Sequence, residues 1–230
     1  MRALMIVTSH DRLGKTGDKT GFWLEELAAP YHEFKKHGFD VDIASPLGGE
    51  APIDPKSLTS ISALITTYLL DRDLSKKFKH TLSLEFIDQS GTDYDVIFVV
   101  GGHGIMWDGP DNHTLQRILA RSFEQGHVVA AVCHGPAALV NVKLHNGELL
   151  VKGRRVNSFT DEEERDLKLD TDVPFLLETR LRELGANFEK APPQELCVVQ
   201  DGRLITGQNP ASAAAVAHCA IEQLKMPAHT

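Results

Sequence analysis

Cysteine is scarce in this chain, and the three that occur, Cys133, Cys197 and Cys219, show no paired spacing. An odd number without pairing argues against a disulfide framework and favours a reducing cytoplasm as the compartment. Long hydrophobic runs are also missing, since none approaches the ~20 residues that a membrane-spanning helix needs. The apolar part of the first ten residues is too short for a signal peptide and predicts a strand instead.

An excess of positive charge is absent as well. Lys and Arg number 24 against 32 Asp and Glu, which gives a formal net charge of -8. This balance provides no basic patch and argues against nucleic acid as a partner. No G-x-G-x-x-G run follows the first expected strand, and neither His-x-His nor His-Glu-x-x-His occurs. The sequence therefore predicts no dinucleotide site and no metal site.

The pattern that is present alternates strands with helices, as in a mainly parallel sheet with helices on both faces. Hydrophobic residues make up 42% and charged residues 24% of the chain, which is ordinary for a soluble globular protein. No repeat and no Pro/Gly/Ser-rich linker divides the sequence. We expect one α/β domain over residues 1–230, with small inserted helices and a hairpin in the segments 46–88 and 160–184.

Hydrophobic periodicity and turn signals give the expected elements. Strands are predicted over 2–7, 41–44, 94–100 and 128–132. Helices are predicted over 22–36, 112–126, 161–169, 174–184 and 210–224, with one or two more between 54 and 88 that include 72–82. Two hairpins are predicted, one joining 149–151 to 155–157 and one joining 196–200 to 203–206 through Asp201-Gly202.

Cys133 stands at the junction between a buried strand and a helix start. The apolar run from Val128 to Val132 precedes it, and His134-Gly135-Pro136 with small apolar residues follows. This is the layout of a nucleophile elbow, in which a sharp turn lifts one side chain clear of the sheet. A thiol there meets the positive end of the following helix, which favours the thiolate. The alternative is a core cysteine at the end of a strand.

A second cluster, the glycine-rich run Gly101–Gly104, follows the third core strand. Parallel sheets bind ligands beyond the carboxyl ends of their strands, where this turn would lie. Its backbone amides, with those at the start of the elbow helix, are suited to an oxyanion hole. The candidate substrate-binding and oxyanion-binding residues are Gly102, His103, Gly104 and Gly135. The alternative is a turn whose glycines serve only its backbone dihedrals.

Imidazole and carboxylate groups are the partners that a thiol nucleophile needs near neutral pH. His134 is adjacent to Cys133, while His10 and His103 lie on loops of the same face. Glu26 follows Phe22 and Trp23 in the first helix, where it would turn inward and share a proton with the thiol at a raised pKa. The alternative for Glu25 and Glu26 is a pair of solvated acids at a helix start.

The acidic run Asp161–Glu164 also begins an expected helix. Acidic residues favour helix starts, which explains the run without any catalytic role. One of its members is nevertheless placed to orient His134, as the third member of a catalytic triad does.

Together these segments resemble the ThiJ/PfpI superfamily of class I glutamine amidotransferase-like proteins, and within it the heat-shock chaperone-like branch that contains glutathione-independent glyoxalases. The resemblance covers nearly the whole chain. It implies a flavodoxin-like, doubly wound sheet. The motifs that carry it are Lys19-Thr20-Gly21 with Glu26 and Pro30-Tyr31, Gly102-His103-Gly104, the segment 130–137, Ser158-Phe159-Thr160-Asp161 with Glu164, and the segment 201–212.

The resemblance implies a role for each site residue. Cys133 is the nucleophile, His134 the triad histidine, Glu164 its third member and Glu26 the acid that holds the thiolate. The implied reaction converts methylglyoxal or glyoxal to lactate or glycolate without glutathione, metal or other cofactor, in a stress-protective role. The partners implied are a small dicarbonyl substrate and a second copy of the chain in a homodimer.

Other activities share this superfamily and stay open at this point. A holdase chaperone would use exposed apolar surface and not Cys133. A cysteine peptidase or amidase would use the same thiol on an amide, and a redox sensor would need only its oxidation. A glutaminase is disfavoured, because Asn209-Pro210 stands where glutamine amidotransferases carry a His-x-Glu pair.

Overall fold

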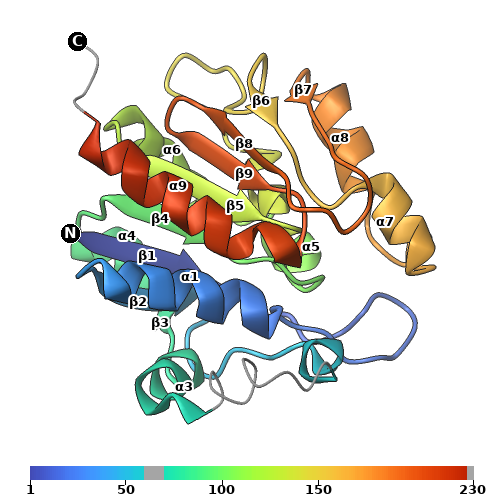
Figure 1. Ribbon diagram of the computed structural model, residues 1–230, viewed down its shortest axis with the longest axis horizontal. Helices are drawn as coiled ribbons and strands as arrows, with labels where there is room; N and C mark the ends of the chain where they lie inside the picture. The colour runs from blue at the N-terminus through green and yellow to red at the C-terminus, as the bar shows by residue number, and fades with distance from the viewer. Residues whose placement is uncertain (60–69, 227–230) are drawn as a thin grey trace.

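A seven-stranded sheet forms the centre of the computed structural model, which describes residues 1–59 and 70–226 (Figure 1). The strand order is β3-β2-β1-β4-β5-β9-β8, and neighbouring strands are parallel except β8 and β9. The strands are β1 (Arg2–Ile6), β2 (Asp40–Ser45), β3 (Leu82–Ser83), β4 (Val96–Val99), β5 (Val128–Val132), β8 (Val198–Asp201) and β9 (Leu204–Gly207). The doubly wound α/β fold predicted from the sequence is confirmed.

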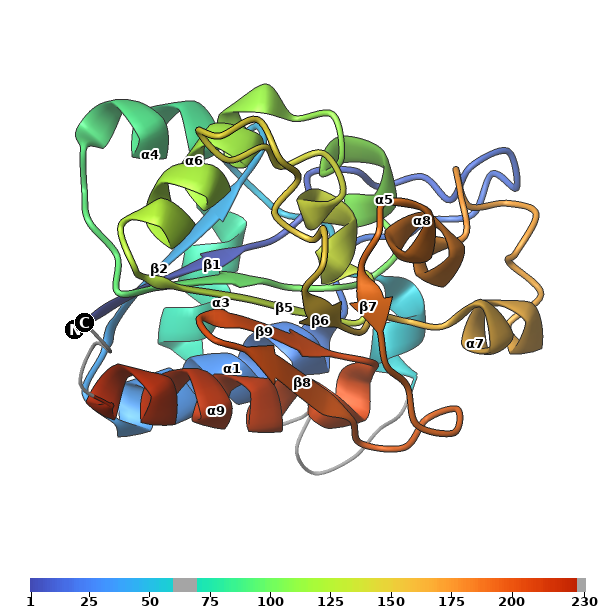
Figure 2. The ribbon, with the colours of Figure 1, turned by 90° about the horizontal axis from the view of Figure 1, so that it is seen from above.

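Helices cover both faces of this sheet (Figure 2). One face carries α1 (Leu24–Lys36), α3 (Arg72–Lys79) and α9 (Ala213–Lys225); the other carries α4 (Leu84–Ser90), α5 (Ile105–Asp108) and α6 (His113–Glu124). The helices α7 (Asp161–Asp166) and α8 (Leu177–Glu183) lie together at one end of the sheet (Figure 2). The short 3-10 helices within the described residues are η1 (Pro55–Leu58), η2 (Gly135–Leu139) and η3 (Pro210–Ser212).

The two-layer cover follows from the alternation of side chains along buried strands. In β1, Ala3 and Met5 join the core beneath α1 and α9, while Leu4 and Ile6 join the core beneath α4 and α6. All four are fully buried, so the strand is apolar throughout and not alternately polar. Because both faces of such a strand are buried, a continuous apolar run in the sequence predicts a central strand.

The direction of chain winding reverses at β1. After β1 the chain builds β2 and β3 on one side, then crosses to place β4 and β5 on the other. Open parallel sheets bind ligands at such a switch point, beyond the carboxyl ends of the strands. Gly101 follows β4 and Cys133 follows β5 at this edge, so the topology brings both predicted clusters together.

One predicted hairpin is confirmed and the other is wrong. β8 and β9 pair in antiparallel fashion around Asp201-Gly202. No hairpin joins 149–151 to 155–157, because β6 (Arg155–Val156) pairs in parallel with β7 (Asn187–Phe188). The Gly153 amide donates to the Gly185 carbonyl at 2.8 Å, so the Lys152-Gly153 turn is held by a distant segment and not by its own flanking strands.

The other differences are two elements that the sequence did not indicate, α5 and β7, and the ends of the rest. Ends of the predicted helices and strands lie within three residues of the observed ones. The helix predicted over 72–82 ends at Lys79, and Leu82–Ser83 instead forms the edge strand β3. Part of the helical prediction for 54–88 falls on 60–69, outside the described residues. None of the helices in the described ranges combines the length and apolarity needed to traverse a bilayer.

Candidate active site

The turn after β5 holds Cys133 in a left-handed backbone conformation, with φ 59°. A side chain in this region costs about 1–3 kcal/mol and persists only where its surroundings hold it. Here the Cys133 amide donates to the Gly207 carbonyl at 2.9 Å, and its carbonyl accepts from the Phe159 amide at 2.8 Å. The elbow geometry predicted for Cys133 is therefore present, held by the ends of β9 and of the 157–160 segment.

Glu26 and Cys133 meet beneath Gly101, the first residue of the glycine-rich turn. A Cβ atom on Gly101 would lie 2.3 Å from Glu26 Oε2 and 2.8 Å from Cys133 Cβ, so only glycine leaves room for both. Glu26 is fully buried, and among the described residues no hydrogen bond of normal geometry reaches its carboxyl oxygens. Its polar surroundings are the Cys133 thiol and the Gly101 backbone.

Burial sets the protonation of this pair. Desolvation raises the pKa of Glu26 to about 8, although the Cys133 thiol and the Gly101 backbone oppose the change. Burial also raises the pKa of the Cys133 thiol well above its ordinary value, and the Glu26 carboxylate raises it further. The Gly102 amide, which hydrogen-bonds the sulfur, acts in the opposite direction. Glu26 is therefore a neutral acid at pH 7, and the pair loses only one proton before charge repulsion opposes loss of the second.

The predicted lowering of the thiol pKa by a helix dipole is wrong. The element after Cys133 is η2, five residues of 3-10 helix, so few aligned peptide dipoles point at the sulfur. Cys133 is also only 4% exposed, and desolvation is the largest cause of the raised pKa of its thiol. A sequence pattern shows which groups are adjacent, but it does not show how much water reaches them.

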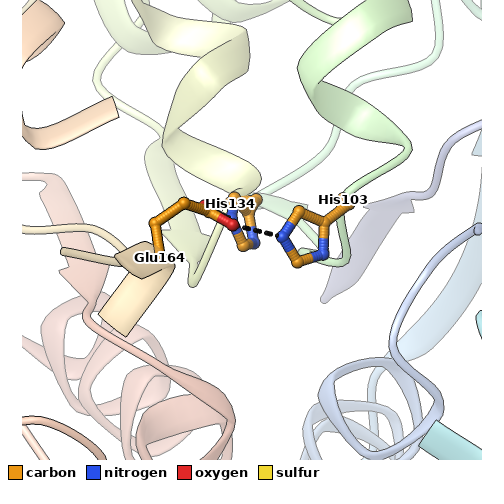
Figure 3. Close-up of side chains that lie close together, drawn as sticks. All are labelled: His103, His134 and Glu164. Carbon is orange, nitrogen blue, oxygen red and sulfur yellow. Dashed lines mark hydrogen bonds and ion pairs between the residues drawn. The ribbon is translucent and has the colours of Figure 1, made fainter. Parts of the chain in front are cut away.

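Glu164 links two histidines through its two oxygens (Figure 3). His134 Nε2 lies 2.7 Å from Glu164 Oε2, and His103 Nε2 lies 2.7 Å from Glu164 Oε1. On the other side of its ring, His134 Nδ1 lies 3.3 Å from Cys133 Sγ. Because an ionised carboxylate only accepts hydrogen bonds, both histidines carry their proton on Nε2. A continuous chain therefore runs from Cys133 through His134 to Glu164.

The charge on Glu164 is stabilised by its histidine partners. Burial alone would raise its pKa, but the hydrogen bonds and electrostatic interactions with His134 and His103 together lower it. The pKa of His134 is lowered by burial and by the neighbouring His103, against the opposing effect of Glu164. At neutral pH this gives a neutral imidazole at the sulfur and an anionic carboxylate behind it.

The four acids of the 161–164 run have separate surroundings. Glu162 is exposed, and Asp161 accepts hydrogen bonds from the amide and hydroxyl of Thr179. Glu163 forms the capping box of α7 with Thr160 and also accepts from the Gln194 amide and the Asn209 side chain. Only Glu164 of the four reaches His134. The sequence left this assignment to the resemblance, because adjacent glutamates on a helix cannot be separated by spacing alone.

A cavity of about 350 Å³ opens above the sulfur. Cys133, His134, His103 and Gly102 line it together with apolar side chains and four polar or acidic ones. The apolar side chains are Trp23, Phe159, Leu167, Pro210 and Ala211; the others are Glu163, Asp166, Gln194 and Asn209. No Lys or Arg is among these described lining residues. No sequence motif indicates the side walls of the cavity, because their residues come from five separate segments and share no local spacing.

Two candidate glycines and one candidate histidine lie away from this cavity. A Cβ on Gly104 would meet the His10 carbonyl at 2.7 Å, and one on Gly135 would meet the Val99 carbonyl at 2.5 Å. These glycines allow close packing of the backbone and do not line the cavity. His10 stacks on Trp107 with ring centroids 5.1 Å apart, and its Nε2 bonds the Arg12 carbonyl. Gly102 and His103, in contrast, lie at the sulfur.

His103, His134 and Glu164 also have the ligand types of a metal site. One ligand atom from each lies within 4.8 Å of the others, and all three residues are buried. Two imidazoles and a carboxylate can bind a divalent transition-metal ion. In this arrangement, however, the Nε2 atoms and carboxylate oxygens already bind one another at 2.7 Å, so a cation would have to break both hydrogen bonds. Motif spacing did not indicate this group, since its members come from three segments.

Comparison with known proteins shows the family to which the chain belongs. A sequence model described as the DJ-1/PfpI family matches residues 19–223. The chain belongs to the DJ-1/PfpI family. Its relatives include the protein named glutathione-independent glyoxalase HSP31 of Saccharomyces cerevisiae, 34% identical over 97% of this chain and 98% of that protein.

Two solved structures match the fold over nearly its full length. The Rapid Encystment Protein 24 kDa of Francisella tularensis superposes with a TM-score of 0.91 and 37% identity, over 97% of this chain and 98% of that one. Glyoxalase III of Candida albicans superposes with a TM-score of 0.85 and 28% identity, over 97% of each chain. The branch of the family indicated by the sequence is confirmed.

Proposed function

We propose that this protein is a glutathione-independent glyoxalase that converts methylglyoxal, or another small 2-oxoaldehyde, to the 2-hydroxy acid. The observation that carries the proposal is the arrangement around one sulfur: the buried Glu26 carboxyl group lies on one side, and His134, hydrogen-bonded to Glu164, lies on the other. The raised pKa of Glu26 and the lowered pKa of His134 favour a protonated acid and a neutral imidazole at pH 7. The similarity to proteins named glutathione-independent glyoxalase and glyoxalase III supports the same activity.

The first step uses Cys133 as the nucleophile. Its sulfur bonds the aldehyde carbon, and the thiol proton, relayed through Glu26, ends on the aldehyde oxygen as a hemithioacetal hydroxyl. A neutral acid is needed here, because a Glu26 carboxylate would repel the oxygen anion that develops. The raised pKa of Glu26, about 8, supplies that acid at neutral pH.

The second step moves hydrogen between carbons. His134 Nδ1 takes the proton from the hemithioacetal carbon, and the C–H electron pair forms the C=C bond of an enediolate whose charge lies on the neighbouring oxygen. The hydroxyl proton then passes from the first oxygen to the neighbouring one, and the same nitrogen of His134 returns the carbon proton to the adjacent carbon. The result is a thioester of the 2-hydroxy acid. Water then attacks the thioester carbon, the acid leaves, and the sulfur regains a proton. The net reaction adds one water to the substrate and needs no other co-reactant.

A lactate assay with methylglyoxal in the absence of glutathione tests the proposal. Cys133→Ala should reduce lactate formation to the uncatalysed rate, whereas Cys219→Ala, a change on α9 outside the lining of the cavity, should retain wild-type turnover. Full turnover by the Cys133→Ala protein would remove the mechanism. Release of free amine from peptide amides, or client protection that survives Cys133→Ala, would instead favour the hydrolase or the chaperone.

We also propose that the chain works as a single domain, as a homodimer and in the cytoplasm, as the resemblance implies. Sedimentation velocity on the purified protein tests the dimer. A single cooperative unfolding transition that coincides by fluorescence and circular dichroism is the expected behaviour of one domain.

A further inference from the structure

We infer that His103 is a second catalytic base, which carries a proton between the two oxygens of the bound substrate while His134 serves its carbons. This inference rests on the proposed function and adds a residue to its chemistry. It begins from the geometry of Figure 3, in which His103 and His134 approach the same carboxylate from different segments. The two imidazole centroids are 4.0 Å apart, tilted by 39°.

The shared carboxylate fixes where each histidine has a free lone pair. Both Nε2 atoms donate to Glu164, at 2.7 Å each, so the acceptor on each ring is Nδ1. The Nδ1 of His134 faces the Cys133 sulfur at 3.3 Å. The Nδ1 of His103 has no hydrogen-bond partner among the described residues. Buried polar atoms without a partner do not include it, so this nitrogen is accessible to solvent.

His103 therefore presents a basic nitrogen to the cavity. Its ring lines the cavity beside Cys133, and its side chain is 8% exposed. Phe159 packs against both imidazoles, with centroids 4.5 Å from His134 and 6.3 Å from His103, and limits how either ring can turn. An imidazole anchored on one nitrogen and open on the other is arranged as a general base.

The proposed reaction needs a second base because two protons move. The carbon proton passes from the aldehyde carbon to its neighbour through His134. As the carbonyl of the thioester forms, the hemithioacetal hydroxyl must also lose its proton, and the neighbouring oxygen must gain one. His103 Nδ1 accepts the hydroxyl proton from the first oxygen and donates it to the neighbouring oxygen. Both histidines are therefore neutral at the end. Glu164 stabilises whichever imidazolium forms in between.

His103→Gln separates this role from a structural one. The glutamine side-chain amide can still donate to Glu164, but it has no basic nitrogen. We expect kcat for lactate formation to fall by about 100-fold or more, the usual contribution of a general base. The rate of Cys133 alkylation by iodoacetamide should stay within twofold of wild type. His10→Gln is the matched control, because His10 stacks on Trp107 and does not line the cavity, and it should retain full activity.

A second variant guards against a folding defect. His103→Ala leaves space beside Glu164, and added imidazole should restore part of the lost turnover, with a dependence on pH that follows the free base. Undiminished turnover of His103→Gln would overturn the inference. So would a loss of turnover matched by an equal loss of alkylation rate, because His103 would then act only by positioning Cys133 and His134. Failure of the proposed function is distinct, since wild-type protein would then make no lactate.

Discussion

Glu26 and Cys133 share the space left by the missing side chain of Gly101. A methyl group there would lie 2.3 Å from the Glu26 carboxyl, 2.6 Å from the Val132 carbonyl and 2.8 Å from the Cys133 Cβ. Two of these contacts are with side chains of the site, and the third is with backbone that cannot move without shifting β5. Glu26 and Cys133 can therefore lie close together only because residue 101 has no side chain, and a substitution that adds one tests this.

Gly101→Ala should accordingly damage both the site and the fold. We expect a loss of about 1–3 kcal/mol in the free energy of unfolding, the usual cost of overpacking, and at least a tenfold loss of kcat/KM with methylglyoxal. Chemical denaturation and steady-state kinetics measure the two effects. Gly38→Ala is the control: it strains a backbone at φ 78° but its added methyl group meets no atom of the described residues within 4 Å, so it should lower stability without changing kcat/KM. Unchanged kinetics in Gly101→Ala would show that the close approach is not needed.

The raised pKa of Glu26 predicts a stability that declines as pH rises. The folded protein keeps the Glu26 proton up to about pH 8, whereas the unfolded chain releases it near 4.5, so the folded state binds more protons between these values. The lowered pKa of His134 acts oppositely, but only below its ordinary value of 6.5. Between pH 7 and 8, Glu26 should therefore reduce the free energy of unfolding by up to about 1.4 kcal/mol per pH unit.

Glu26→Gln isolates this contribution. The amide cannot ionise, so urea unfolding measured at pH 7.0, 7.5 and 8.0 should give a flatter pH dependence than wild type. Its kcat should fall by about 100-fold or more, because the amide cannot relay the thiol proton. Glu162→Gln, a change at an exposed acid away from Glu26, should keep the wild-type slope and rate. Equal slopes for wild type and Glu26→Gln would contradict the buried, protonated acid.

Contiguous signals predicted the centre of the site, and long-range packing decided the rest. The sequence indicates the elbow at Cys133 because the elbow is built from neighbouring residues. It indicates the parallel strands of the sheet because both faces of these strands are buried, so each strand is a continuous apolar run. The inward position of Glu26 was one of two alternatives, and packing on the sheet settled it. The thiol pKa was predicted in the wrong direction, since its desolvation depends on segments far away in sequence.

The glycines show the same division. Gly102, Gly104 and Gly135 look alike in sequence, yet only Gly102 lines the cavity. Gly104 packs against the His10 carbonyl, which follows β1, and Gly135 packs against the Val99 carbonyl at the end of β4. A turn signal at Lys152-Gly153 was equally ambiguous, because its hydrogen-bond partner is Gly185 and not the adjoining chain. A glycine in a sequence indicates that another group packs closely against the backbone there, but it does not indicate which group.

Glu164 should tune the basicity of His134. Its negative charge raises the pKa of that imidazole against the effects of burial and His103, so Glu164→Gln should lower the pKa further. Since a base acts only when unprotonated, the acidic limb of the pH profile of kcat/KM should move to lower pH, with a smaller plateau. Glu162→Gln, on the exposed side of the same helix, should leave the profile unchanged. A limb that moves to higher pH would show that Glu164 does not act on His134 as a charge.

The lining of the cavity predicts a preference for neutral substrates. Glu163 and Asp166 line it, and none of the described lining residues carries positive charge, so an anionic dicarbonyl would meet repulsion without a compensating ion pair. Trp23, Phe159 and Leu167 offer apolar contact to an aromatic group. Phenylglyoxal and 4-carboxyphenylglyoxal differ chiefly in charge, and we expect kcat/KM to be at least tenfold higher for the neutral compound. Asp166→Asn should narrow that ratio by about two- to fivefold, since the exposed Asp166 carboxylate interacts weakly through water. A ratio near one for the wild-type protein would mean that the charge of the cavity does not select the substrate.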